Sequence, residues 1–118
     1  MISVMKQITL NPDQQRALTL LENNCKKVEL YINNDDQKEA MCLLEDQKVI
    51  EVTFYDEDEL CVAYTDFEDG DECQETMSNS ELDNSFIDRM FKRVTNETDH
   101  LDHYSNQTHA QKIRDFLK

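Results

Sequence analysis

Carboxylates are the most abundant reactive groups in this sequence, and they are unevenly placed. The chain of 118 residues has 26 Asp and Glu against 12 Lys and Arg, a formal net charge of −14. Residues 35–83 hold 18 of the acids and two cations, which gives −16, whereas residues 1–34 and 84–118 each come to +1. Crowded like charges repel one another, so this concentration indicates a surface that meets a cationic partner. The alternative is a set of solvated loops with no partner.

Two acidic runs stand out inside the central block, and both coincide with turn residues. They are Asp56-Glu57-Asp58-Glu59, and the group Asp66, Glu68, Asp69, Asp71, Glu72 and Glu75. The second run suggests a calcium loop, but with Gly70 at the sixth position the first, third and twelfth positions are Thr65, Phe67 and Thr76. The first, third and twelfth positions of the loop therefore lack the acidic ligands that an EF-hand calcium site requires. Weak, unspecific binding of divalent cations by this loop is the alternative left open.

Three histidines, His100, His103 and His109, fall close together beside Asp99 and Asp102. His-x-x-His spacing on a helix could hold a metal ion with a carboxylate as a further ligand. The surrounding residues are polar and favour an exposed loop, so whether these histidines bind metal stays open and no metal ligand is assigned.

The four cysteines, Cys25, Cys42, Cys61 and Cys73, include no C-x-x-C pair. Three of them have apolar neighbours, which indicates buried free thiols that act as small hydrophobic residues. Free thiols are typical of a reducing compartment. No apolar run approaches the roughly 18 residues that span a bilayer, and Lys6 interrupts an N-terminus that does not resemble a secretory signal. We therefore expect a cytoplasmic protein with no membrane contact.

A single glycine excludes several enzyme signatures. Neither the dinucleotide-binding pattern, nor the phosphate-binding loop, nor the G-x-S-x-G elbow can be written with one glycine. A Cys–His pair or a pair of carboxylates could be assembled from the residues present, but nothing local marks any of them as activated. We expect no catalytic residue and no cofactor, and therefore a binding protein, not an enzyme.

The helix and strand patterns in the sequence predict a single acidic α+β domain over residues 1–118. Asn11-Pro12-Asp13 is a good helix start, with an N-cap, a proline at the first position and an acid in the first turn, and apolar spacing extends the helix to Asn24. Residues 27–32 alternate as a strand. Two further strands over about 48–65 form a central hairpin with the acidic tetrapeptide at its tip. The sheet is expected to be antiparallel, packed by the N-terminal helix and by C-terminal helices.

The remaining segments are less regular. Residues 36–45 fit either a helix or a strand, and a capping box at Asp36 favours the helix. Residues 66–77 are expected to form a loop. A second capping box at residues 78–81 is expected to open a helix that ends near Val94. A polar connection and a short terminal helix, 109–117, complete the chain.

These observations favour an inhibitor that occupies a cationic protein, of the kind that binds nucleic acid, without binding nucleic acid itself. Duplex DNA presents one negative charge per ~1.7 Å of axis, which a rigid hairpin tip and a neighbouring acidic loop could imitate. In size and charge the chain resembles anti-restriction, anti-CRISPR and nuclease-immunity proteins, which suggests a phage or mobile-element setting. The expected contact residues are Asp56, Glu57, Asp58, Glu59, Asp66, Glu68, Asp69, Asp71 and Glu72.

An alternative hypothesis is an adaptor or accessory subunit whose contact surface is apolar. The helix from Leu82 to Val94 would then be the contact, in a complex with another protein or in a homodimer. Salt separates the two hypotheses, because binding that survives about 0.5 M salt, where the Debye length is only about 4–5 Å, cannot depend on exposed charge.

Overall fold

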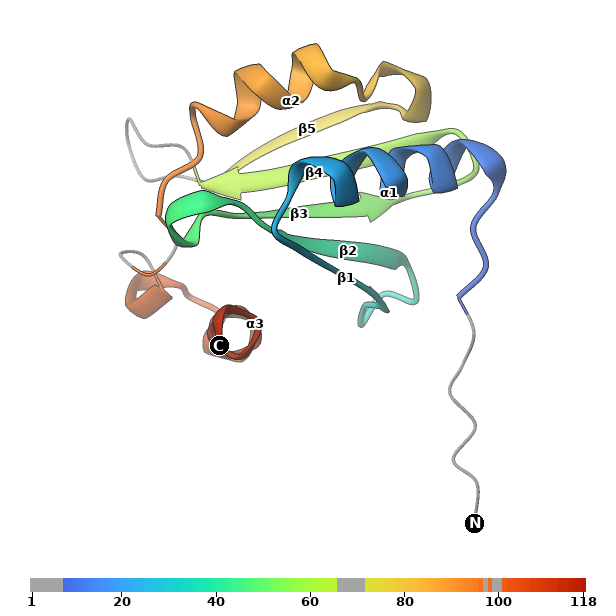
Figure 1. Ribbon diagram of the computed structural model, residues 1–118. Coiled ribbons are helices and arrows are strands. Elements are labelled where there is room, and N and C mark those ends of the chain that lie inside the picture. Colours follow the sequence, from blue (N-terminus) through green and yellow to red (C-terminus); the bar gives the residue numbers. More distant parts are fainter. Residues whose placement is uncertain (1–7, 66–71, 97, 99–100) are drawn as a thin grey trace.

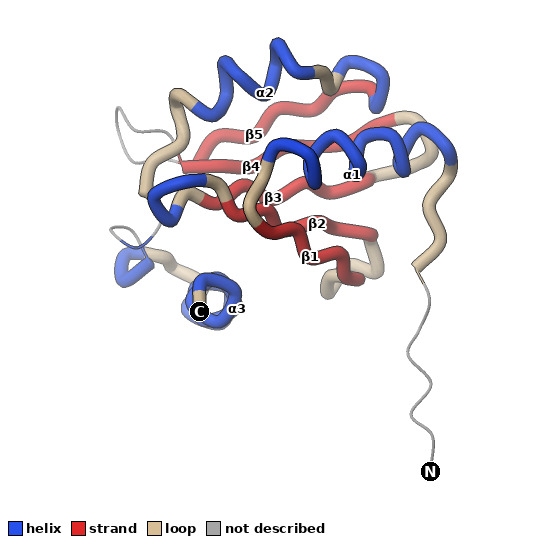
Figure 2. Tube along the Cα trace, viewed as in Figure 1, coloured by secondary structure: helices blue, strands red, loops and turns tan. Residues whose placement is uncertain are grey.

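The fold is built on one five-stranded antiparallel sheet in which every strand pairs with its neighbour in sequence (Figures 1 and 2). The structure is a computed structural model that describes residues 8–65, 72–96, 98 and 101–118. The strands are β1 (Lys27–Ile32), β2 (Lys38–Leu43), β3 (Val49–Phe54), β4 (Glu59–Thr65) and β5 (Glu72–Ser78). The expected class, a small α+β domain with a central hairpin formed by β3 and β4, is confirmed.

One face of the sheet forms the main core with two helices. Val28, Cys42, Ile50 and Tyr64 lie opposite one another across β1 to β4, so their side chains share a face. Helix α1 (Pro12–Asn24) and helix α2 (Asn84–Phe91) cover this face (Figure 1). The predicted strand at residues 27–32 is thus confirmed.

Helix α1 begins where the sequence indicated. The side-chain oxygen of Asn11 accepts a hydrogen bond from the backbone N–H of Gln14 at 2.8 Å, and the side chain of Gln14 accepts one from the N–H of Asn11 at 3.0 Å. This reciprocal cap satisfies two of the backbone donors that a helix start leaves free. Ala17 and Leu21 are fully buried, so the helix face that carries them packs against the sheet.

Helix α3 (Gln107–Leu117) lies on the opposite face of the sheet (Figure 1). Its buried residues Ala110, Ile113 and Phe116 pack in a second cluster with Met41 and Val49. The predicted terminal helix is confirmed. The connection before it is less polar than expected, because Leu101–His103 forms a 3₁₀ turn and Leu101 is buried in this cluster.

The helix favoured for residues 36–45 is wrong, because this segment contains β2. Ala40 and Cys42 face α1 and α2, whereas Met41 packs in the cluster under α3. A strand buried on both faces has a continuous apolar run instead of alternation, and such a run also fits one face of a helix.

Two other boundaries differ from expectation. The loop expected over residues 66–77 is wrong for residues 72–77, which belong to the edge strand β5. The positions of β5 that face the main core include the exposed Glu75, so its alternating pattern is weak. The predicted capping box at residues 78–81 does not form, because the Ser78 side chain makes no cap hydrogen bond, and residues Asn79–Glu81 form only a 3₁₀ turn. Helix α2 starts later, with Asp83 as N-cap, whose carboxylate accepts from Phe86 N at 2.8 Å.

The apolar side of α2 is covered by the sheet. Leu82, Ile87, Met90 and Val94 are at most 2% exposed, so the face expected to contact a partner in the adaptor hypothesis lies inside the core. Among the described residues, no helix has the length and apolar character needed to cross a membrane.

Candidate functional site: an acidic end of the sheet

The turns β1–β2 and β3–β4 lie at the same end of the sheet. Ile32 pairs with Lys38, Lys38 with Phe54, and Phe54 with Leu60, so the two turns are joined by one row of paired residues. The 3₁₀ turn after β5 reaches this end too, because Asn79 N donates to Asp58 O at 2.7 Å. We call this region the acidic end, after its exposed acids Asp35, Asp36, Asp56, Glu57, Asp58, Glu59 and Glu81.

The carboxylate of Asp56 shapes the β3–β4 turn. Its Oδ1 accepts hydrogen bonds from the N–H groups of Asp58 and Glu59, both at 2.8 Å, an arrangement that favours a tight turn. The carboxylates of Glu57 and Asp58 make no such local bond in the described part of the chain. Asp56 therefore has a structural role, whereas Glu57 and Asp58 present their charge to solvent.

Every backbone carbonyl of residues 56–58 accepts a hydrogen bond from another element. Gln14 Nε2 donates to Asp56 O at 2.9 Å, and Asn79 Nδ2 donates to Glu57 O at 2.9 Å. Asn11 Nδ2 also donates to Glu57 O, at 3.0 Å, and the carbonyl of Asp58 receives the Asn79 N–H described above. The acidic turn is therefore fixed to both α1 and the 3₁₀ turn after β5.

Two of the three residues that donate to this turn, Gln14 and Asn79, are also the buried polar residues of the described chain, at 4% and 1% exposure. A buried amide is costly unless it is hydrogen-bonded. Here both amides hold the same exposed, charged turn. This is the strongest structural observation about the acidic end.

The cations near the acidic end do not neutralise it. Arg16 Nη2 donates to the carbonyls of Asn79 at 2.6 Å and Leu82 at 3.3 Å, and Lys38 Nζ donates to the carbonyl of Thr9. Within the described residues, no ion pair involves the seven acids of the acidic end. Their field consequently extends into solvent, where it can attract cations.

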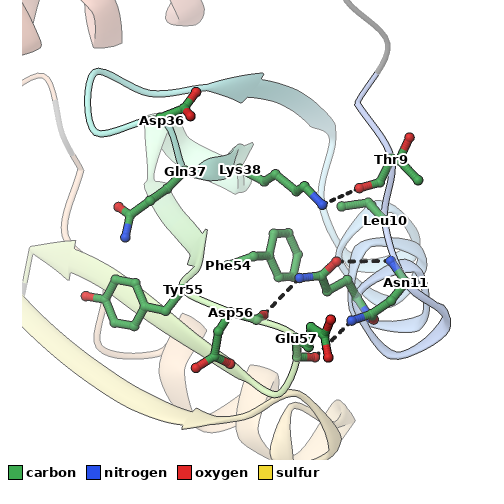
Figure 3. A pocket seen from close by; sticks show the side chains of 11 residues that line it. Thr9, Leu10, Asn11, Asp36, Gln37, Lys38, Phe54, Tyr55, Asp56 and Glu57 are labelled. Atoms are coloured by element: carbon green, nitrogen blue, oxygen red, sulfur yellow. Dashed lines mark hydrogen bonds between the residues drawn. The ribbon is translucent and has the colours of Figure 1, made fainter.

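A pocket of about 450 Å³ lies beside the acidic turn (Figure 3). Phe54 and Leu10 supply apolar lining, and Asp36, Asp56 and Glu57 stand around it. Asp36 has a left-handed backbone, φ 61°, a conformation that Asp tolerates better than most residues. Asn33 stabilises this turn, since its Oδ1 accepts from the N–H groups of Asp35 and Gln37, both at 2.9 Å.

The structure places the two predicted acidic runs differently. Asp56, Glu57, Asp58 and Glu59 lie on the hairpin end and are exposed, as expected. Asp66, Glu68, Asp69 and Asp71 lie outside the described residues. The strand ends that flank them, Thr65 and Glu72, pair with each other at the far end of β4 from Glu59. Seven strand residues span roughly 20 Å, so Glu72 lies about one strand length from Glu59.

A polar cluster on the face under α3 was not foreseen. Glu39 Oε1 accepts from Thr53 Oγ1 at 2.8 Å, and the Tyr31 hydroxyl donates to Glu39 Oε2. Burial, and then the bond to Glu39, raise the pKa of Tyr31 far above its usual value. His109 Nε2 lies 2.9 and 3.1 Å from the two oxygens of Glu51, and this hydrogen bond is the main reason that the pKa of His109 is raised.

This cluster joins elements that are far apart in sequence. Its members come from β1, β2, β3 and α3, and its hydrogen bonds link side chains of different elements. The sequence pattern that could have predicted this cluster is weak. It consists of polar residues at strand positions that face away from the main core, together with one histidine on a helix. The strand register places Tyr31, Glu39 and Thr53 side by side. This neighbourhood could not be predicted because residues 36–45 were expected to form a helix.

The two histidines in the described part of the chain, His103 and His109, do not converge on one site. His109 pairs with Glu51, His103 is exposed, and His100 lies outside the described residues. Across residues 8–65, 72–96, 98 and 101–118, no group of three or more His, Cys, Asp or Glu side chains is placed to hold a metal ion.

Comparisons with protein-family models, with curated proteins and with solved structures found no match.

Proposed function

We propose that this chain is an inhibitor that binds a cationic protein through its acidic end and occupies a surface that the partner uses for nucleic acid. The supporting observation is the attachment of the acidic turn by the buried side chains of Gln14 and Asn79. A turn held in place before binding loses less conformational freedom on association, which favours affinity. A merely solvated loop has no need of two buried amides.

Charge complementarity supplies the rest of the proposal. Exposed carboxylates without cationic partners raise the rate of encounter with a positive surface, and this effect weakens as salt rises. Four exposed carboxylates would occupy the positions at which the partner binds the phosphates of nucleic acid: those of Asp35, Asp36, Glu57 and Asp58. The chain itself, at −14, repels nucleic acid, so it competes for the partner's site without binding DNA or RNA.

Capture from an extract tests the proposal. The immobilised full chain is expected to retain a protein that is released by a salt gradient and displaced by added duplex DNA. Substituting Glu57→Lys together with Asp58→Lys is expected to reduce that capture by about tenfold or more, because close charge pairs at interfaces are worth several kcal/mol. Asp56 is left unchanged because its carboxylate holds the turn.

The matched control is Glu22→Lys with Asp88→Lys. Both acids are exposed, and they lie on α1 and α2, outside the acidic end. The two variants change the net charge equally, so only position separates them. Equal capture by both variants, or retention that survives about 0.5 M salt, would contradict the proposal and favour an apolar contact instead.

We also propose that the protein acts in the cytoplasm. Its four cysteines, Cys25, Cys42, Cys61 and Cys73, are free, which is typical of proteins in a reducing compartment. Detection of a tagged chain in cell fractions would test this, and recovery in a secreted or periplasmic fraction would contradict it.

A further inference from the structure

A cavity of about 310 Å³ lies between the β1–β2 turn and the start of α3. All the residues that line it are polar or charged. The turn and β2 supply Asp35 and Glu39, which we call the acidic wall. Helix α3 supplies His109 and Lys112, which we call the basic wall. The volume is at the lower end of the range for pockets that bind small molecules.

Contacts between α3 and the sheet hold the basic wall in place. His109 Nε2 lies 2.9 Å from one oxygen of Glu51 and 3.1 Å from the other. This hydrogen bond raises the pKa of His109, which favours the charged imidazolium. Lys112 Nζ lies 3.5 Å from the centre of the Tyr31 ring, a cation–π contact that positions the ammonium group without neutralising it.

Hydrogen bonds hold the acidic wall as well. The Glu39 carboxylate accepts from Thr53 Oγ1 at 2.8 Å and from Asn33 Nδ2 at 3.4 Å. It also accepts from the Tyr31 hydroxyl. A carboxylate has about four acceptor sites, so Glu39 keeps room for a further donor. The N–H of Asp35 donates to Asn33 Oδ1 at 2.9 Å, which fixes the turn while the Asp35 side chain stays exposed.

The charges of the two walls are separated across the cavity. Lys112 lines the same cavity as Asp35 and Glu39, yet no ion pair joins these three side chains in the part of the chain that the structure describes. A lone anion in the cavity is repelled by the acidic wall, and a lone cation by the basic wall. A small zwitterion brings an opposite charge to each wall at once.

We propose that this cavity binds a free α-amino acid, with the ammonium group at the acidic wall and the carboxylate at the basic wall. The cavity and its two walls of opposite charge carry the inference. The basic wall suits the carboxylate, because an ammonium and an imidazolium donate charge-assisted hydrogen bonds. The site needs no partner protein, so the inference goes beyond the proposed function of the acidic end.

Heteronuclear NMR of the isotope-labelled full chain tests this inference. Each of the common L-amino acids is added at about 10 mM, which is ten times a Kd of about 1 mM. At least one is expected to shift the backbone amides of Asn34, Thr108 and His109 in a saturable way. Its analogues without the amino group or without the carboxylate are expected to bind about tenfold or more weakly, because each loses charge-assisted hydrogen bonds. No saturable shift with any amino acid, or equal binding of either analogue, would overturn the inference.

Two variants test the walls separately. Lys112→Met and Asp35→Asn each remove one charge from an exposed side chain, so the fold is retained. Each is expected to weaken binding of the amino acid by about tenfold or more. The controls Lys92→Met and Asp88→Asn make the same changes at exposed positions in or next to α2 and should leave the affinity unchanged. Wild-type affinity in Lys112→Met would also overturn the inference.

This site and the acidic end can fail independently. Asp35 belongs to both, but Glu57 and Asp58 do not line the cavity. The variant Glu57→Lys with Asp58→Lys is therefore expected to bind the amino acid as wild type does, whatever its effect on capture of a cationic protein. The NMR measurement involves no partner, so a negative result there leaves the proposed function of the acidic end untouched.

Discussion

Gln14 and Asn79 show how single buried amides can stabilise an exposed, highly charged turn. Gln14 accepts from Asn11 N at 3.0 Å and donates to Asp56 O at 2.9 Å, so one side chain both caps α1 and anchors the β3–β4 turn. The helix start and the turn are therefore coupled through a residue that is only 4% exposed. Loss of one partner from a buried hydrogen bond leaves the other unsatisfied, which is costly.

Substituting Gln14→Ala tests this coupling. It is expected to lower the free energy of unfolding by about 1–3 kcal/mol, because the Asp56 carbonyl loses its donor and the helix loses half of its cap. Urea unfolding followed by circular dichroism measures the change. The control is Gln15→Ala, the same chemical change at the exposed neighbour, which should alter stability by no more than about 0.5 kcal/mol. Similar losses in both variants would show that Gln14 does not anchor the turn.

His109 makes the docking of α3 depend on pH. Glu51 raises the pKa of His109 above 6.5, and Glu39 adds to this effect while burial and Lys112 oppose it. Because the folded pKa lies above the unfolded pKa, the pair stabilises the fold fully below about pH 6.5, and its contribution disappears as pH rises through the raised folded pKa.

Comparison with His109→Gln isolates this contribution. The difference in free energy of unfolding between wild type and variant is expected to be larger at about pH 6 than at about pH 9, where His109 is neutral. His103→Gln, at an exposed histidine, should show no such difference. An equal effect of His109→Gln at both pH values would mean that packing of the imidazole, and not its charge, holds α3.

At the scale of elements, the helices and strands with a clear local sequence pattern were the ones predicted correctly. Helix α1 and strand β1 have the predicted bounds, because a helix cap and strict alternation are local signals. Strand β2 was missed because helices cover both of its faces, which only the whole fold reveals. The acidic turn was located, but its anchors Gln14 and Asn79 were not, since their contacts join residues 42 and 22 positions apart.

Helix α3 offers a test of the second hydrophobic cluster. Ile113 is 1% exposed between α3 and the sheet, so Ile113→Ala is expected to lower the free energy of unfolding by about 2–5 kcal/mol. Leu117→Ala, at the half-buried end of the same helix, should cost clearly less. Denaturant unfolding measures both. A small effect of Ile113→Ala would show that α3 contributes little to the stability of the sheet.

At the scale of the whole molecule, the acidic charge and the stability of the fold oppose each other. A chain at −14 repels itself, and the acidic end places seven exposed carboxylates on adjoining turns. Such repulsion lowers the stability of the folded state and is screened by salt. If the proposed function is correct, binding to a cationic surface offsets this cost in stability.

Glu57→Lys with Asp58→Lys therefore separates stability from binding. Neither carboxylate holds the turn, so the variant is expected to have a Tm equal to or higher than that of wild type at low salt, because close repulsions are removed. The gain should shrink in about 0.5 M NaCl, where the Debye length is about 4–5 Å. Scanning calorimetry at the two salt concentrations measures it, with Glu22→Lys and Asp88→Lys as the variant of equal charge. A Tm lower than wild type at both salt concentrations would show that these two side chains support the fold, and reduced capture by the variant could then no longer be attributed to charge alone.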